Sequence, residues 1–234
     1  MSTHRTWSEI VAADPSHSRR YAQRWEQFAA QGRDIDGEAR LIDAMAPRTA
    51  RILDAGCGQG RLGGYLAGRG HEVVGVDIDP YLISVARNRQ PGGTWLVGDL
   101  AGLGEVLSNA ADQELSDAHP TGTHPSGNFD LIVAAGNVLT FIDPADRIAV
   151  LEGFRDALAG AAGNPGDEGN AAEGGVGEQG RAVLGFGAGR GWDFDQFERD
   201  AAAAGLRVLQ RFGTWDLRPF DPAGGFLVAV LERA

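Results

Sequence analysis

The chain of 234 residues contains no lysine, a single cysteine and no long apolar run. Because Cys57 has no second cysteine to pair with, an internal disulfide is excluded, and Cys57 is read as a small filler residue. No apolar stretch approaches the ~20 residues that a transmembrane helix requires, and the first residues, MSTHRTWSEI, lack the basic and apolar regions of a signal peptide. We therefore expect a cytoplasmic protein with no membrane partner. No histidine or cysteine cluster has metal-ligand spacing, so no metal is expected.

All 21 positive side chains are arginine, and 32 acidic residues leave a formal net charge of −11. This balance opposes non-specific binding to nucleic acid, which needs clustered positive charge. The length suits one large α/β domain with a full core. We expect a small molecule rather than nucleic acid as the partner, and the oligomeric state is unknown from the sequence.

The strongest pattern lies between residues 51 and 99. The apolar run RILDA ends in three alternating glycines, Gly56, Gly58 and Gly60, and a segment with apolar residues at helical spacing follows. This order predicts a strand, a glycine loop and a helix. Glycines suit such a loop because it turns tightly and lets a ligand approach bare backbone.

Acidic residues end the next two predicted strands. HEVVGVD ends on Asp77, which follows Asp54 by 77 − 54 = 23 residues, and TWLVGD ends on Asp99. An acid about 20 residues after the first strand is the one that binds ribose hydroxyls in dinucleotide folds. Asp79 and Pro80 are predicted to begin a helix as N-cap and first-turn residue. Two acids and a glycine loop are therefore expected at one edge of the sheet.

Taken together, DAGCGQG, GVD and GDL resemble the cofactor site of class I S-adenosylmethionine-dependent methyltransferases. An acid before the glycines and another after the third strand distinguish this pattern from that of a Rossmann dehydrogenase. The resemblance implies an α/β fold, with a Rossmann-like, doubly wound and mostly parallel seven-stranded sheet. Its last strand is antiparallel, and helices cover both faces.

The resemblance also implies roles for individual residues. Asp77 is expected to bind both ribose hydroxyls of S-adenosylmethionine, and Asp99 the adenine amino group, with the Leu100 amide on a ring nitrogen. Gly56 and the backbone around it would hold the methionine part, while Asp54 would balance the ammonium group. The full set expected to bind the cofactor is Asp54, Gly56, Gly58, Gly60, Asp77, Ile78, Asp99, Leu100 and Ala135.

The methyl acceptor is much less well indicated. Asn137 follows the buried strand FDLIVAAG, at the edge where open α/β sheets bind ligands. It is the candidate residue on the acceptor side, although a turn-capping role is an equal alternative, and the catalytic residues stay unknown. An acidic acceptor would require an arginine in the pocket; the candidates are Arg24, Arg190 and Arg218.

The remaining segments complete the expected architecture. Residues 1–46 are expected to form an arm and helices that cover the cofactor mouth, and residues 47–234 the methyltransferase domain. Residues 1–15 are predicted to be a loose arm, and residues 16–32 an amphipathic helix whose Tyr21 and Trp25 either pack or touch ligand. Flexible inserts are expected near 104–127, which include His119 and His124, and near 161–180. Further predictions are a helix from Asp143–Pro144 with Ile148 in its buried stripe, a helix from Asp193 or Asp195, and two antiparallel strands at the end.

Two other functions remain open. An oxidoreductase would bind NAD through a similar fold, and a non-catalytic protein would bind S-adenosylmethionine for regulation, because a fold does not by itself define a function.

Overall fold

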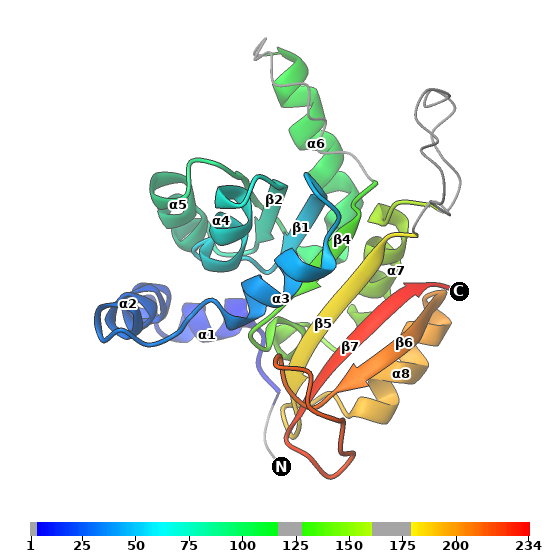
Figure 1. The fold of residues 1–234 in the computed structure, drawn as a ribbon. Coiled ribbons are helices and arrows are strands. Elements are labelled where there is room, and N and C mark those ends of the chain that lie inside the picture. The colour runs from blue at the N-terminus through cyan, green and yellow to red at the C-terminus, as the bar shows by residue number, and fades with distance from the viewer. Residues whose placement is uncertain (1–3, 117–127, 161–178) are drawn as a thin grey trace.

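The computed structural model describes residues 4–116, 128–160 and 179–234, and one seven-stranded sheet runs through them (Figure 1). The strands are short and rich in β-branched and other apolar residues, as expected for strands buried between helices. They are β1 (Arg51–Ala55), β2 (Glu72–Asp77), β3 (Thr94–Val97), β4 (Leu131–Ala134), β5 (Arg181–Gly187), β6 (Leu206–Phe212) and β7 (Phe226–Arg233).

The strand order across the sheet is β3-β2-β1-β4-β5-β7-β6. β1 pairs in parallel with β2 and β4, so Leu53 lies between Val74 and Ile132. β7 is antiparallel to both β5 and β6. The predicted mostly parallel sheet with a reversed last strand is confirmed. The strand order switches after β3, because β4 lies on the opposite side of β1 from β2 and β3. β1 and β4 are therefore the neighbours at the switch point, where ligands bind in open α/β sheets.

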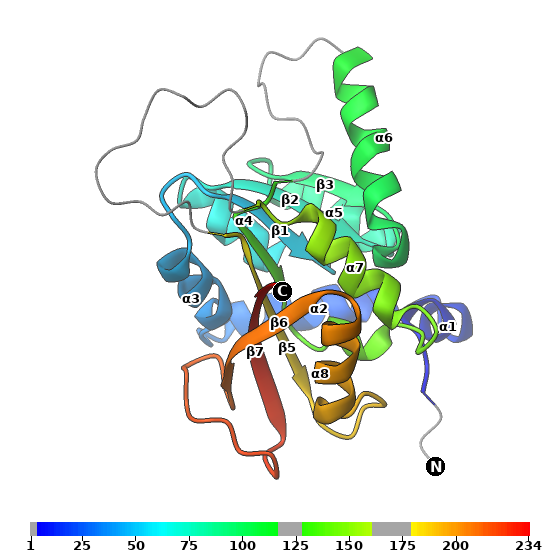
Figure 2. The same ribbon diagram turned by 90° about the vertical axis from the view of Figure 1, so that its right-hand side faces the viewer.

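Helices cover both faces of the sheet. Because side chains alternate along a strand, Ile52 points into a core with α3, α4 and α5, and Leu53 into a core with α6, α7 and α8. Figure 2 shows α7 and α8 lying in front of the strands. The helices are α1 (Trp7–Ala13), α2 (His17–Ala30), α3 (Gly37–Met45), α4 (Arg61–Gly68), α5 (Pro80–Arg89), α6 (Leu103–Ser116), α7 (Arg147–Ala157) and α8 (Phe194–Ala203), with 3-10 turns η1 (Leu100–Gly102) and η2 (Val138–Phe141).

The loose arm predicted for residues 1–15 is wrong, because Trp7–Ala13 forms α1. Thr6 and Glu9 make a reciprocal capping box at its start, in which each side chain accepts from the other residue's backbone N–H. The motif is visible in the sequence as T-x-x-E. In α2, the predicted stripe is confirmed for Tyr21, Trp25 and Phe28, which make successive edge-to-face ring contacts, although Ala29 is exposed.

The flexible insert predicted for 104–127 is wrong in its first half, which belongs to α6. Leu103 and Leu107, one turn apart, are buried against the sheet and fix this helix. The rest of that insert, with His119 and His124, lies outside the described residues, as does nearly all of the insert predicted at 161–180. α7 begins at Arg147 rather than at Asp143, and Ile148 is 41% exposed, because Val150, Leu151 and Phe154 form the buried stripe.

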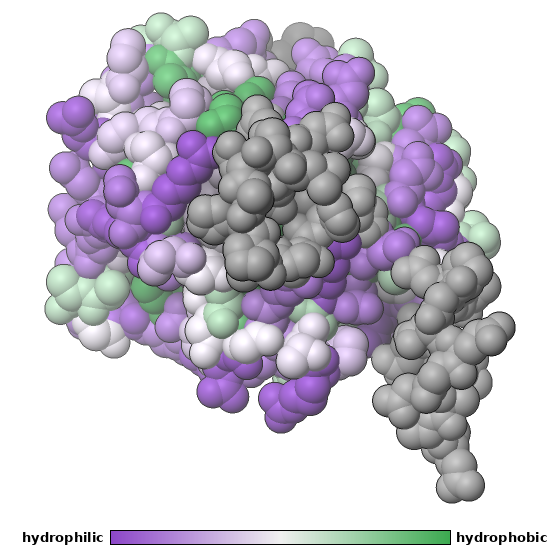
Figure 3. Space-filling model, turned by 90° about the horizontal axis from the view of Figure 1, so that it is seen from above, coloured by the Kyte–Doolittle hydropathy of each residue, from purple (hydrophilic) through white to green (hydrophobic). Residues whose placement is uncertain are grey.

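The helix predicted from Asp193 and the antiparallel end of the sheet are confirmed. No helix in the described ranges is long and apolar enough to cross a membrane. Figure 3 views the molecule from the end at which α6 projects, and hydrophilic residues predominate on the surface it shows there, with small, scattered apolar groups. α1 and α2 lie together at the other end of the sheet, near the carboxyl ends of the parallel strands (Figure 1).

Candidate active site

The glycine loop between β1 and α4 is held against β2. The backbone N–H groups of Gly56 and Cys57 both donate to Val76 O, at 2.8 and 3.1 Å. Gly56 has φ +74°, and a Cβ there would overlap the methyl groups of Val138 from the loop after β4. The glycine is therefore required both by the left-handed backbone and by the close approach of a neighbouring loop.

Asp77 joins this loop to the end of β2. Its Oδ2 accepts from Gly58 N at 2.8 Å, and its Oδ1 accepts from Asp79 N at 2.9 Å. Burial raises the pKa of Asp77 to about 6, although both backbone hydrogen bonds act in the opposite direction. The carboxylate is thus fixed in orientation at the carboxyl edge of the sheet.

Asp54 lies behind the loop rather than in front of it. It is 3% exposed, and its Oδ2 accepts from Gly63 N in the first turn of α4 at 2.9 Å. Burial raises the pKa of Asp54 to about 7. The carboxylate therefore stabilises the start of α4, where backbone N–H groups have no helical partner.

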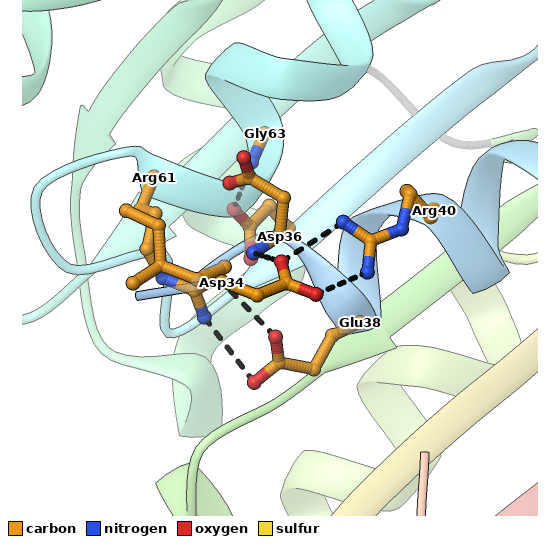
Figure 4. Close-up of polar contacts among 8 residues, drawn as sticks. Asp34, Asp36, Glu38, Arg40, Arg61 and Gly63 are labelled. Carbon is orange, nitrogen blue, oxygen red and sulfur yellow. Dashed lines mark hydrogen bonds and ion pairs between the residues drawn. The ribbon is translucent and has the colours of Figure 1, made fainter. Parts of the chain in front are cut away.

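Figure 4 shows how the start of α4 is tied to the segment before α3. Arg61 donates to the backbone oxygen of Ile35 and forms an ion pair with Glu38 at 3.3 Å. Its guanidinium carbon also lies 4.3 Å from the ring centroid of Trp25 on α2. Trp25 thus has a structural partner behind the glycine loop.

Asp99 follows β3 by two residues and caps the turn η1, where its Oδ1 accepts from Ala101 N at 3.0 Å. The residue is exposed at the same edge of the sheet as Asp77. Asp77 at the end of β2 and Asp99 just after β3 therefore lie at one edge of the sheet, as the sequence predicts for neighbouring parallel strands.

A cavity of about 280 Å³ opens at this edge. Six of the nine residues expected to bind the cofactor line it: Gly56, Gly58, Asp77, Ile78, Asp99 and Leu100. Asp54, Gly60 and Ala135 are not part of the lining. Gly60 instead adopts φ +75° as the N-cap of α4, where a Cβ would press on Trp95 and Ala86. Its role is to pack the loop against its neighbours.

The opposite wall of the cavity comes from the N-terminal segment and from the chain after β4; the sequence did not predict the helix α1 in it. α1 and the residue before it supply Thr6, Trp7 and Ser8, and α2 supplies Tyr21. The Trp7 ring lies 5.4 Å from the ring of Tyr21 and 5.5 Å from that of Phe141, both at steep angles. The capping box at Thr6 was the signal that would have placed an ordered helix here. From the chain after β4 come Gly136, Val138, Phe141, Ile142, Asp143 and Asp146.

Comparison with known proteins bears on this geometry. A family model described as a methyltransferase domain matches residues 53–161. A solved TehB-like S-adenosylmethionine-dependent methyltransferase from Corynebacterium glutamicum is 45% identical, with a TM-score of 0.74 over 94% of this chain and 100% of that one. The chain belongs to the S-adenosylmethionine-dependent methyltransferases. Its cofactor is accordingly S-adenosylmethionine.

Curated relatives of this methyltransferase match over shorter segments. Magnesium-protoporphyrin O-methyltransferase of Rhodobacter capsulatus is 36% identical over 142 residues, which are 60% of this chain and 54% of that protein. The 18S rRNA (guanine-N(7))-methyltransferase of Mus musculus is 30% identical over 87 residues, 37% of this chain and 31% of that protein. The chain thus spans about a third to a half of these two relatives.

Asn137 holds the methyltransferase's loop after β4 in place. It has φ +70°, and its Oδ1 accepts from Gly187 N at the end of β5 at 2.7 Å. Asn137 is not part of the cavity lining, although Gly136 and Val138 on either side of it are. The side chain therefore braces the two strand ends that flank the site.

Trp192 and the acceptor candidate Arg218 are outside the cavity lining. Trp192 is 1% exposed and packs in the core on Phe186 and Phe197, and its Nε1 donates to Asp200 at 2.9 Å. Arg218 is exposed and pairs with Asp216. The Cys57 thiol is buried, which raises its pKa and leaves it un-ionised, in line with its reading as a filler.

Proposed function

We propose that this protein transfers the methyl group of S-adenosylmethionine to a small-molecule acceptor that is neutral or positively charged. The observation that carries the proposal is that Gly56 and Gly58 line the same cavity as Asp77 and Asp99. These are the residues that the family resemblance assigns to the methionine, ribose and adenine parts of the cofactor.

The residues present suit this cofactor. The oriented carboxylate of Asp77 is an acceptor for the two ribose hydroxyls, and such charge-assisted hydrogen bonds are the stronger kind. Asp99 and the Leu100 backbone would receive the adenine, with Ile78 beside them. The carboxylates in the lining favour a ligand that carries a sulfonium and an ammonium group. We propose that Asp54 supports the loop from behind and acts on the ammonium group only through it.

S-adenosylmethionine supplies a methyl group on a sulfonium that is itself the leaving group. The chain's own contribution is then to align the acceptor and to keep water out, and positioning of this kind supplies on the order of 7–11 kcal/mol. A general base is needed only where the acceptor loses a proton during attack. We therefore assign no catalytic base, and we propose that Asn137 positions the acceptor-side loop.

The charge of the cavity guides the proposal for the acceptor. Besides Asp77 and Asp99, which are assigned to the cofactor, Asp143 and Asp146 line it together with the rings of Trp7, Tyr21 and Phe141, and no arginine of the described ranges is in the lining. Arg24, Arg190 and Arg218, the candidates for binding an acidic acceptor, are outside that lining. A polyanionic acceptor such as RNA would meet repulsion here, whereas aromatic faces and carboxylates suit a neutral or cationic molecule.

We further propose that residues 1–46 act as the cover of the cofactor site, residues 47–234 as the methyltransferase domain, and that the protein works in the cytoplasm. The first part is supported by the contribution of α1 and α2 to the cavity wall.

The test is incubation with methyl-labelled S-adenosylmethionine and a metabolite extract separated by charge, with total RNA in a parallel reaction. We expect label in the cationic or neutral fractions. Label in RNA or in the anionic fraction would contradict the proposed acceptor class. Tight binding with no transfer to any fraction would favour a non-catalytic role.

A further inference from the structure

We propose that Asp79 is a positioning residue that ties α1 and α2 over the cofactor cavity and so controls how long the cofactor stays bound. The inference rests on the proposed function, since the cavity that these helices cover is the proposed cofactor site. It goes beyond the N-cap role that the sequence indicates for Asp79.

Asp79 has more partners than a helix cap needs. Its Oδ1 accepts from Tyr81 N and Leu82 N at 2.9 and 3.2 Å, which caps α5. Its Oδ2 accepts from Trp7 Nε1 on α1 at 2.8 Å and from Ser18 Oγ on α2. The residue is 4% exposed. One carboxylate oxygen thus serves α5, and the other joins the two N-terminal helices to it.

α1 depends on such tertiary contacts. It has seven residues, none of them buried, and isolated helices shorter than about 12 residues are marginal in water. Its attachments are the Trp7 ring, the bond to Asp79, and a hydrogen bond from His4 Nε2 to Thr140 O at 3.0 Å. Loss of the Trp7–Asp79 bond therefore removes one of few contacts that hold α1 in place.

α1 and the residue before it form part of the wall of a small cavity. The cavity of about 280 Å³ is slightly smaller than the ~300–1,000 Å³ that is usual for ligand pockets, and Thr6, Trp7 and Ser8 form part of its wall. On this proposal, entry and release of the cofactor, and entry of an acceptor, involve a shift of α1. Breaking the bond to Oδ2 is the local change that permits this shift.

Asp79 also connects α1 and α2 to Asp77, the residue proposed to bind the ribose. Its backbone N donates to Asp77 Oδ1, the carboxylate proposed for the ribose. Asp79 thus contacts α1 and α2 through its side chain and Asp77 through its backbone N–H. Closure of α1 and α2 and orientation of Asp77 are expected to occur together.

Three single substitutions test the tether. Asp79→Asn keeps an oxygen for the cap but turns an NH₂ group toward Trp7, Trp7→Phe keeps a ring but removes the N–H, and Ser18→Ala removes the second donor without touching the cavity lining. Trp192→Phe is the matched control, because it removes an indole bond to Asp200 in the core, away from the cavity.

Two measurements are made on each variant. Stopped-flow dissociation of S-adenosylhomocysteine is expected to be about five- to tenfold faster in Asp79→Asn and Trp7→Phe, the loss of one hydrogen bond, and less affected in Ser18→Ala. The double variant Trp7→Phe/Asp79→Asn should be no faster than Asp79→Asn alone, since the bond that Trp7→Phe removes is already lost in Asp79→Asn. Hydrogen exchange of the ligand-free protein should be faster in residues 7–13 and unchanged in β1 and β4.

The Trp192→Phe control should be less stable than wild type, and its rate of S-adenosylhomocysteine dissociation should stay within twofold of the wild-type rate. Dissociation rates in Asp79→Asn equal to that of the control, or fully additive effects in the double variant, would overturn the proposal. If the wild-type protein binds no S-adenosylhomocysteine, the proposed function fails. The tether is tested independently of this, because unchanged hydrogen exchange in residues 7–13 of the Asp79→Asn and Ser18→Ala variants would overturn it.

Discussion

The backbone N–H of Gly58 donates to Asp77 Oδ2 at 2.8 Å, which joins the loop after the first strand to the acid that ends the second. The acid proposed to bind the ribose is therefore also a support of the glycine loop. Removal of the whole side chain would disturb both, so an isosteric change, Asp77→Asn, separates charge from shape.

Binding of S-adenosylmethionine should depend on pH through Asp77. Burial raises the pKa of this carboxyl to about 6, and the ionised form is the better acceptor for ribose hydroxyls and favours a cationic ligand. We expect affinity to fall as the pH is lowered through about 6, and the Asp77→Asn variant to lose this dependence. Calorimetric titrations between pH 5 and pH 8 measure it, and a wild-type affinity that is flat across this range would refute it.

The stability of the ligand-free protein should decrease as the pH rises from about 4 to about 7, because of Asp54. Its pKa in the folded state, about 7, lies above its usual value, so the folded protein holds the proton more tightly than the unfolded chain. The stabilisation by protonated Asp54 is fully present below about pH 4, and it is completely lost once the pH has risen above the folded-state pKa.

Asp54→Asn keeps an acceptor for Gly63 N and removes this titration, so its melting temperature should rise relative to wild type at pH 8 but not at pH 4. Asp195→Asn, on the exposed first turn of α8, is the control and should give parallel curves. Equal pH profiles for wild type and Asp54→Asn would exclude Asp54 as the source.

Gly56→Ala should weaken both folding and cofactor binding. A left-handed backbone costs a non-glycine residue about 1–2 kcal/mol, and the new methyl group would overlap Val138. Adding Val138→Ala should restore part of the loss by making room, while the backbone cost remains. The control is Gly68→Ala at the end of α4, where a Cβ meets nothing within 4 Å and stability should be unchanged or higher. Urea denaturation and calorimetry measure both effects; a Gly56→Ala protein as stable as wild type would be the contrary result.

The sheet could be predicted from local sequence patterns, and so could the part of the proposed cofactor site at the ends of β1, β2 and β3. Apolar runs that lead into glycine or aspartate define β1 to β4, and parallel pairing then brings Gly56, Asp77 and Asp99 to one edge. The reversed last strand followed from the short connection before it. Such features are encoded within a few residues of each other.

The features that the sequence did not predict depend on contacts between residues that are far apart in the chain. α1 was missed because its position rests on Trp7 meeting Asp79, 72 residues away, and not on an apolar stripe of its own. α6 was missed because polar residues around Leu103 and Leu107 resemble a loop until the sheet beneath them is known. Asp54 faces Gly63 rather than the cavity, which its place before the glycines does not reveal.

The measurement closest to the central claim is calorimetric titration of wild-type protein and the Asp77→Asn variant with S-adenosylmethionine, S-adenosylhomocysteine and NAD at pH 7.5. The account predicts binding of the first two to wild type, no binding of NAD, and a loss of about ten- to a hundredfold in affinity in the variant, as expected for a charged hydrogen-bond pair. Binding of NAD without S-adenosylmethionine, or equal affinities in the two proteins, would contradict it.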